Sequence, residues 1–192
     1  MAEQRTQLQK RDRGIALRLE DVPSFTQINT AQNECLKRIL QELLKNIPHE
    51  NVLELYCGAG NFSFDIAAAA QQLFAVDIDK RAIEIAKKRQ NELKITNINF
   101  KSQSAAAFAA QFAEKCDIIV LDPPRKGAVD TLEAIIDLEP RAIIYISCDP
   151  ATLSRDIKKL QAADFALEMT QPVDMFPQTF HVETVSLLRR LS

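Results

Sequence analysis

Short apolar runs alternate with helically spaced apolar positions along most of the chain. Five runs of four or five residues are mostly apolar, as expected of strands that are buried on both faces. They lie at 52–56, 73–76, 98–101, 118–121 and 142–146. Helical spacing occupies the segments at about 62–70, 79–93, 104–114, 129–138 and 150–163. This alternation predicts an α/β fold with a doubly wound, mostly parallel sheet covered by helices on both faces.

The two ends of the chain have different patterns. Residues 1–22 are polar and mixed in charge, which predicts a flexible or loosely packed lead-in before a single domain at 23–192. A helix is expected over 30–47, where apolar residues recur at helical spacing before Pro48. Two further strands, 165–170 and 182–188, are expected to form an antiparallel pair at the edge of the sheet.

Composition narrows the class of protein. The 192 residues are 46% apolar and 26% charged, which is typical of one globular domain in solution. No apolar run is long enough to cross a membrane. The four cysteines are far apart and form no C-x-x-C pair, which argues against a metal site or a disulfide framework and favours the cytoplasm. A net charge of −2 does not indicate strong affinity for nucleic acid. Any contact with RNA or DNA must therefore be local, or helped by a part of the protein that is absent here.

Two features suggest a ligand site at the carboxyl ends of the early strands, where open α/β sheets bind their ligands. Gly58 and Gly60 follow the first strand and let backbone approach a ligand closely, although Ser63 occupies the third glycine position of the dinucleotide fingerprint. A tight strand-to-helix turn is the alternative interpretation. Asp77 ends the second strand, 17 residues beyond Gly60, where a carboxylate can accept both ribose hydroxyls of an adenosine. Its alternative role is helix capping.

Two more features fall at the carboxyl ends of the later strands. Asp122 follows the fourth strand and is fixed by the two prolines after it, although a plain loop is the alternative. Cys148 follows the fifth strand, and Asp149 and Pro150 are typical of the first positions of a helix. A helix N-terminus favours a thiolate, so Cys148 is a candidate nucleophile. The alternative is a small apolar residue that closes a strand.

Six motifs occur in a fixed order between residues 23 and 190. They are FTQIN at 25–29, LYCGAGNF at 55–62, VD at 76–77, DPPRKG at 122–127, SCDPAT at 147–152 and DMFPQTFHVE at 174–183. With these motifs the chain resembles the RNA uracil-C5 methyltransferases, the S-adenosylmethionine-dependent enzymes that make 5-methyluridine in tRNA and 23S rRNA. The last three motifs are the most specific to that family. The resemblance implies a seven-stranded, Rossmann-like class I methyltransferase sheet with an antiparallel strand near the C-terminus.

The resemblance also implies roles for individual residues. Cys148 would add to C6 of the uracil as the nucleophile, and Glu183 would remove the C5 proton. Contacts with S-adenosyl-L-methionine would come from Gln27, Tyr56, Asn61, Asp77 and Asp122, with Gly58 and Gly60 shaping the loop. A further family contact, usually Asn or Asp, corresponds here to Gln103 or Ser104. The resemblance implies no metal among these positions.

Some residues near the motifs have alternative roles. Arg125 and Lys126 stand where they could hold a phosphate of the RNA. Arg155 and Asp156 are expected to fix the helix behind Cys148 rather than to act in the chemistry.

Typical family members also carry an N-terminal RNA-binding barrel, a central domain and, in some cases, a cysteine-ligated iron–sulfur cluster. None of these fits into the residues before Pro23, so a catalytic domain is expected that acts on rRNA or tRNA with RNA-binding domains outside this chain. Two alternatives stay open. A non-catalytic module that binds S-adenosylmethionine or RNA would need neither Cys148 nor Glu183. An exocyclic-amine base methyltransferase would carry an aromatic residue where Arg125 stands.

Overall fold

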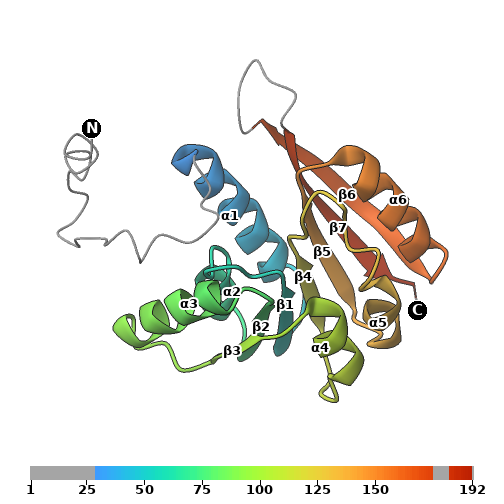
Figure 1. Cartoon of the computed structure of the whole chain (residues 1–192). Coiled ribbons are helices and arrows are strands. Elements are labelled where there is room, and N and C mark those ends of the chain that lie inside the picture. Colours follow the sequence, from blue (N-terminus) through green and yellow to red (C-terminus); the bar gives the residue numbers. More distant parts are fainter. Residues whose placement is uncertain (1–28, 175–181, 192) are drawn as a thin grey trace, which may run out of the picture.

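The computed structural model describes residues 29–174 and 182–191. Seven strands form one sheet in the order β3-β2-β1-β4-β5-β7-β6 (Figure 1). The strands are β1 (Asn51–Leu55), β2 (Gln72–Asp77), β3 (Ile98–Ser102), β4 (Ile118–Leu121), β5 (Ala142–Ser147), β6 (Phe165–Asp174) and β7 (Val182–Arg190). The pairs among β1 to β5 are parallel, and β7 is antiparallel to both β5 and β6.

Helices cover both faces of this sheet. They are α1 (Thr30–Lys45), α2 (Ser63–Ala67), α3 (Lys80–Glu92), α4 (Ala105–Gln111), α5 (Leu132–Asp137) and α6 (Pro150–Gln161). Apolar side chains of α1, α2 and α3 pack on one face, and those of α4, α5 and α6 pack on the other. Within β1, Val52 points to the first layer and Leu53 to the second, as strand geometry requires. The predicted doubly wound α/β fold is confirmed.

The predicted strands begin and end within one residue of the observed ones for β1 to β5. Strands β1, β2, β4 and β5 are buried on both faces, whereas the edge strand β3 alternates between buried and exposed residues. Strand β6 is longer than expected. It continues through Pro172 to Asp174, whereas the sequence predicts an end at residue 170. Among the described strands β6 pairs only with β7, and an edge strand tolerates a proline that an inner strand would not.

The helices are shorter than their apolar patterns suggest. The segment expected at 62–70 is helical only over Ser63–Ala67, and the one expected at 129–138 begins at Leu132. In the second case, Ala128 and Thr131 close a turn before the helix, with 2.8 Å from the Thr131 N–H to the Ala128 carbonyl oxygen. The loop that starts at Asp122 is therefore longer than the sequence predicts.

The position of β7 determines what lies at the carboxyl end of β5. The two strands pair from Ala142 with Arg189 to Ser147 with Thr184. Because the strands are antiparallel, β7 begins where β5 ends. The expected antiparallel pair at the sheet edge is confirmed, with β7 inserted between β5 and β6.

No helix in the described parts of the chain has the length and apolar character needed to cross a membrane. The boundary predicted at residue 22 and the predicted contact residue Gln27 lie outside the described residues.

Candidate active site

The loop after β1 is shaped by Asp77. One oxygen of the Asp77 carboxylate accepts the Gly58 backbone N–H at 2.8 Å, and the other accepts the Asp79 N–H at 2.8 Å. Gly58 and Gly60 have φ values of 54° and 83°, in the left-handed region that favours glycine. At Gly60 an added Cβ would lie 3.0 Å from the ring of Phe64. Asp77 therefore lies against the glycine loop, as the sequence analysis expects.

Two other predicted contact residues flank the same loop. The Tyr56 hydroxyl lies 2.6 Å from the Thr131 hydroxyl, and its ring packs with the α4–α6 layer. The Asn61 side-chain amide exchanges two hydrogen bonds of 2.9 Å with that of Asn33 on α1. Tyr56 and Asn61 thus contact opposite layers. The sequence analysis did not single out Asn33, although a buried amide on an otherwise apolar helix face was the available signal.

A second residue missed from the sequence is Glu54, on β1. Its side chain is 2% exposed and accepts the Ser63 hydroxyl at 2.5 Å. Burial raises the pKa of Glu54 to about 8, against the lowering effect of the Ser63 hydrogen bond, and the neighbouring carboxylates of Asp122 and Asp77 raise it further. The Glu54 carboxyl group is therefore mostly protonated at neutral pH. An acidic residue inside a buried strand run was the signal for it.

Asp122 follows β4 at the same edge. Its backbone N–H reaches the Leu55 carbonyl oxygen at 3.4 Å, so it continues the ladder between β4 and β1. Burial, followed by the negative charges of Glu183 and Asp77, raises the pKa of Asp122 to about 8. Pro123 beside it is buried. The structure thus brings Asp77 and Glu183 within electrostatic reach of Asp122.

The loop that begins at Asp122 is fastened to helix α6. Asp156 of α6 is fully buried and accepts hydrogen bonds from the Ala128 N–H at 2.8 Å and from the Tyr145 hydroxyl at 2.7 Å. Tyr145 belongs to β5, so Asp156 joins the loop, the strand and the helix that surround Cys148. This arrangement agrees with the structural role expected for Asp156.

Arg155 adds a second link between α6 and the loop. Its guanidinium donates to the Lys126 carbonyl oxygen at 2.8 Å and to the Asp156 carboxylate at 2.8 and 2.9 Å. The ammonium of Lys126 pairs with Asp130 at 2.7 Å. Lys126, which the sequence analysis considered for phosphate binding, therefore has an acidic partner within its own loop.

Cys148 stands between β5 and α6 and is half-buried. Asp149 caps the helix, because its carboxylate accepts the N–H groups of Ala151 at 3.0 Å and Thr152 at 2.9 Å. The first-turn donors that were expected to favour a thiolate thus bind the Asp149 carboxylate. The predicted cap and helix start are confirmed, but the predicted electrostatic effect on Cys148 is not.

The pKa of Cys148 is raised, not lowered. Burial is the main cause, followed by the negative charges of Glu183 and Asp122, and these outweigh the Arg125 guanidinium. The sequence argument considered only the helix that begins after Cys148. Burial of the thiol, together with the carboxylates of Glu183 in β7 and Asp122 after β4, reverses the expected direction of the pKa shift.

Glu183 lies close to Cys148. The ladder of β5 and β7 ends with the pair of Ser147 and Thr184, and Cys148 and Glu183 are the next residues beyond that pair. The Glu183 charge acts on the Cys148 thiol, as expected of two side chains near each other. One carboxylate oxygen of Glu183 is buried and has no hydrogen-bond partner among the described residues, and burial raises the pKa of the group. Such an oxygen is suited to accept a proton.

Gln103 and Ser104, the two positions to which the further family contact corresponds, have different surroundings. The Ser104 hydroxyl accepts the Ala107 N–H at 3.3 Å and so caps α4. The Gln103 backbone N–H donates to the Asp77 carbonyl oxygen at 2.9 Å, so Gln103 adjoins Asp77. In the described ranges no group of three or more His, Cys, Asp or Glu residues is placed to hold a metal ion.

Comparison with known proteins agrees with the resemblance seen in the motifs. The model of the tRNA (uracil-5-)-methyltransferase family matches residues 3–191. The chain belongs to this family. An uncharacterized RNA methyltransferase of Bacillus cereus is 38% identical over 172 residues, which are 88% of this chain and 37% of that relative. Another, from Gloeobacter violaceus, is 38% identical over 178 residues, 92% of this chain and 38% of that relative. The chain thus spans less than two fifths of the length of these relatives.

Solved structures show the same relationship. The Pyrococcus abyssi tRNA (uracil-54, C5)-methyltransferase in complex with S-adenosyl-L-homocysteine has a TM-score of 0.75 and 31% identity, over 86% of this chain and 40% of that one. The N-methyltransferase NodS of Bradyrhizobium japonicum has a TM-score of 0.70 at 17% identity, over 86% of this chain and 100% of that one. The second likeness concerns the fold alone, that of the class I methyltransferases.

Proposed function

We propose that this chain is the catalytic domain of an S-adenosylmethionine-dependent methyltransferase that modifies C5 of a uridine in rRNA or tRNA. The observation that carries the proposal is that Cys148 and Glu183 directly follow the last pair of the β5–β7 ladder, Ser147 with Thr184, and that the charges of Glu183 and Asp122 act on the Cys148 thiol. A thiol and a proton acceptor close together are the two groups that this reaction needs. The family membership and the bound product in the P. abyssi enzyme support the same assignment.

The glycine loop fits S-adenosyl-L-methionine. An added Cβ at Gly58 would meet no atom within 4 Å, so the loop has open space on that side, while Asp77 holds its backbone. Asp77 would accept the ribose hydroxyls, and Gln27, Tyr56, Asn61 and Asp122 would complete the contacts. When bound, the cofactor supplies a methyl group on a positively charged sulfur.

The reaction assigned to the protein side chains is covalent catalysis followed by general-base catalysis. The Cys148 thiol loses its proton to water, and its sulfur bonds to C6 of the uracil. The electron pair of the C5–C6 π bond moves to C5 and the C4 carbonyl oxygen, which makes C5 electron-rich. After C5 has gained its methyl group, the Glu183 carboxylate removes the C5 proton. The electron pair of that C–H bond restores the C5–C6 double bond as the S–C6 bond breaks and Cys148 leaves as a thiolate. The raised pKa of Glu183 makes it a better proton acceptor than an ordinary carboxylate.

The RNA target must present its uridine outside a helix, because C5 and C6 are not accessible to a thiol inside a base stack. With a net charge of −2, this chain has little general attraction for RNA. We therefore assign part of RNA recognition to domains that the longer relatives carry beyond the matched segment.

The test is the intact-protein mass after incubation with S-adenosylmethionine and a short RNA that carries 5-fluorouridine. Fluorine cannot leave as a cation, so the reaction stops at the methylated, Cys148-linked RNA. We expect this adduct in the unaltered chain and in Cys35→Ala, a control at another half-buried cysteine, but not in Cys148→Ala. An adduct that persists in Cys148→Ala would exclude the assigned nucleophile. Binding of S-adenosylmethionine without any adduct, even when RNA-binding domains of a relative are added in trans, would favour a non-catalytic module.

A further inference from the structure

Basic residues are concentrated in one part of a chain that is acidic overall. Residues 79–101, which form α3 and β3, contain seven Lys and Arg against three Asp and Glu, a net charge of +4. The whole chain carries −2, which leaves −6 for the remaining residues. All seven basic side chains of this stretch are exposed. A local positive surface therefore exists where the total charge suggests none.

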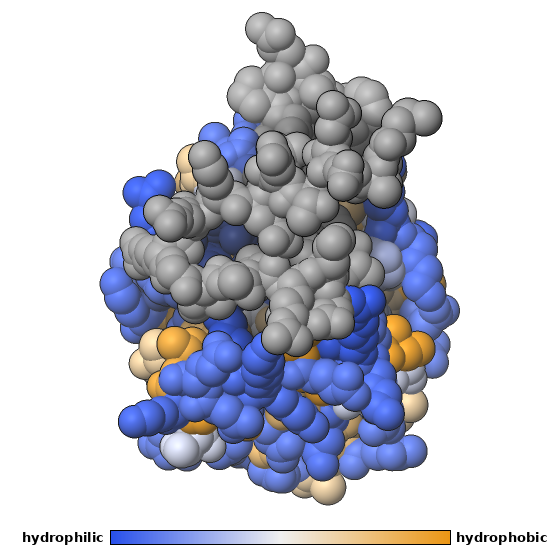
Figure 2. All heavy atoms as spheres, turned by 60° about the vertical axis from the view of Figure 1, so that its left-hand side comes forward, coloured by the Kyte–Doolittle hydropathy of each residue, from blue (hydrophilic) through white to orange (hydrophobic). Residues whose placement is uncertain are grey.

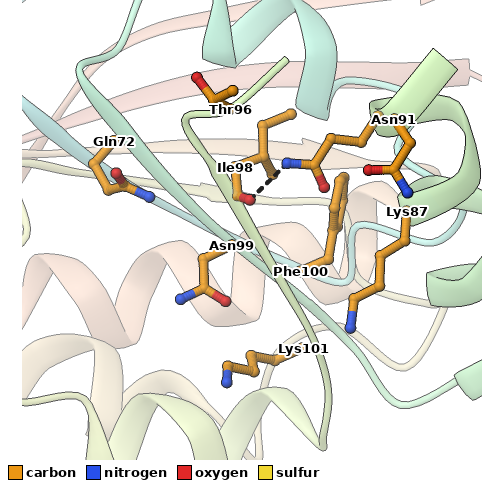
Figure 3. A pocket seen from close by; sticks show the side chains of 9 residues that line it. Gln72, Lys87, Asn91, Thr96, Ile98, Asn99, Phe100 and Lys101 are labelled. Carbon is orange, nitrogen blue, oxygen red and sulfur yellow. Dashed lines mark hydrogen bonds between the residues drawn. The ribbon is translucent and has the colours of Figure 1, made fainter. Parts of the chain in front are cut away.

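This surface is hollowed between α3 and β3. A depression of about 490 Å³ is lined by Lys87 and Asn91 of α3 and by Asn99 and Lys101 of β3, with Gln72 beside them (Figure 3). Figure 3 shows the Lys87 side chain extending from α3 and the Lys101 side chain on β3. In the view that brings this side of the molecule forward, the described surface is largely hydrophilic (Figure 2). We call the exposed surface of α3 and β3 the basic edge.

The basic edge begins close to the candidate active site. Lys101 pairs in register with Val76, the residue before Asp77, so it stands at the carboxyl end of the sheet. Helix α3 starts with Lys80, three residues after Asp77. Lys80 and Lys87 are seven residues apart, which places them on one face of the helix about 10 Å apart along its axis. The positive charge therefore extends from the site along α3 and away from it.

We propose that the basic edge binds the phosphate backbone of the RNA, as a second contact away from the uridine that reacts. Exposed lysines and side-chain amides are the groups that contact phosphate and sugar oxygens without reading sequence. The one aromatic ring in the depression, Phe100, is only 3% exposed and offers no surface for a base to stack on. The contact therefore positions the RNA and does not select a base. This inference rests on the proposed function for the nature of the substrate.

The experiment is titration of a fluorescently labelled single-stranded RNA with the full chain at about 50 to 200 mM salt. The test variant replaces Lys87 and Lys101 by glutamine. The control replaces Lys158 and Lys159 by glutamine, two exposed lysines near the end of α6 that is remote from Cys148. Both variants lose two charges, and unchanged thermal unfolding shows that both still fold.

Each phosphate contact with a single strand contributes about 0.7 to the slope of log affinity against log salt. Loss of two contacts should lower the slope by about 1.4, so the loss of affinity between about 50 and 200 mM salt should be about 7-fold smaller than for the unaltered chain. The Lys158→Gln, Lys159→Gln control should change both quantities little. Equal losses in the two variants would overturn the inference, because they would report total charge and not a site. Unchanged affinity in the test variant, or no binding by the unaltered chain at the lowest salt, would overturn it as well.

The Cys148 adduct separates this inference from the proposed function. The unaltered chain could form the adduct while the Lys87→Gln, Lys101→Gln variant binds RNA with unchanged affinity. This result would support the proposed reaction and contradict RNA binding by the basic edge. Salt-dependent RNA binding that weakens in this variant, with no adduct in the unaltered chain, would support the basic edge and contradict the proposed reaction.

Discussion

Gly127 is the residue of the Asp122 loop whose replacement has the most clearly defined consequence. Its φ of +76° lies in the left-handed region. A Cβ added there would lie 2.6 Å from Nη2 of Arg155 and would also overlap Oδ2 of Asp156. Both atoms belong to the hydrogen-bond network that fastens the loop to α6. Gly127→Ala therefore disturbs the backbone and the network together.

The cost can be estimated in two parts. An L-residue held in the left-handed region costs about 1–2 kcal/mol. Displacement of the Asp156 carboxylate leaves the buried Ala128 N–H or the Tyr145 hydroxyl without its partner, at about 1–3 kcal/mol. Gly127→Ala should thus lower the free energy of unfolding by about 2–5 kcal/mol, a large part of the 5–15 kcal/mol typical of a domain.

Gly58→Ala is the matched control. Gly58 also has a positive φ, +54°, but an added Cβ there would meet nothing within 4 Å. Only the backbone part of the cost applies, about 1–2 kcal/mol. Urea unfolding followed by circular dichroism gives both values under the same conditions. If Gly127→Ala were no more destabilising than Gly58→Ala, the network around Asp156 would not constrain this loop and the reasoning would be refuted.

Three further predictions concern ionisable groups of the site. Because the pKa of Glu54 in the folded chain is about 8, above the 4.5 of an ordinary Glu, its contribution to stability is complete below about pH 4.5 and is lost as the pH rises through 8. Glu54→Gln should therefore make the decline in unfolding free energy between about pH 5 and pH 8 shallower by up to about 1.4 kcal/mol per pH unit, and parallel declines would contradict this. Glu183→Gln should lower the pKa of Cys148, because it removes a neighbouring negative charge. Iodoacetamide should then alkylate Cys148 at lower pH, as measured by peptide mass spectrometry. An unchanged pH profile of alkylation would show that the Glu183 charge does not reach the thiol. Asp77→Ala should weaken S-adenosylmethionine binding sharply in a calorimetric titration. The loss should be larger than for Asp77→Asn, which keeps an acceptor for the Gly58 N–H. If Asp77→Ala bound S-adenosylmethionine as tightly as the unaltered chain, Asp77 would not belong to the site.

The sequence predicts the sheet well because its signals are local. A run such as 142–146 is apolar at every position, and only a strand covered on both faces requires that pattern. Asp149 and Pro150 mark the start of α6 by their own chemistry, and the structure begins the helix at Pro150. The order of the strands follows from the same pattern once the chain is taken as doubly wound.

The electrostatic state of the site could not be predicted in this way. The pKa of Cys148 depends on Asp122 and Glu183, which are 26 and 35 residues away along the chain, and on the depth at which the thiol is buried. The protonated state of Glu54 depends on burial beneath α2 and on the Ser63 hydroxyl. Such quantities belong to the packed molecule, because each sums the fields of groups that only the tertiary fold brings together.

The ladder between β5 and β7 makes the relation of Cys148 to Glu183 independent of what lies between them in the chain. The 34 intervening residues include α6 and β6, yet the two residues are brought close together by the backbone ladder between β5 and β7, which ends at Ser147 and Thr184. A shift of one residue in β7 would turn Glu183 to the other face of the sheet. The register of β7, and not the separation along the chain, therefore determines which side chain adjoins Cys148.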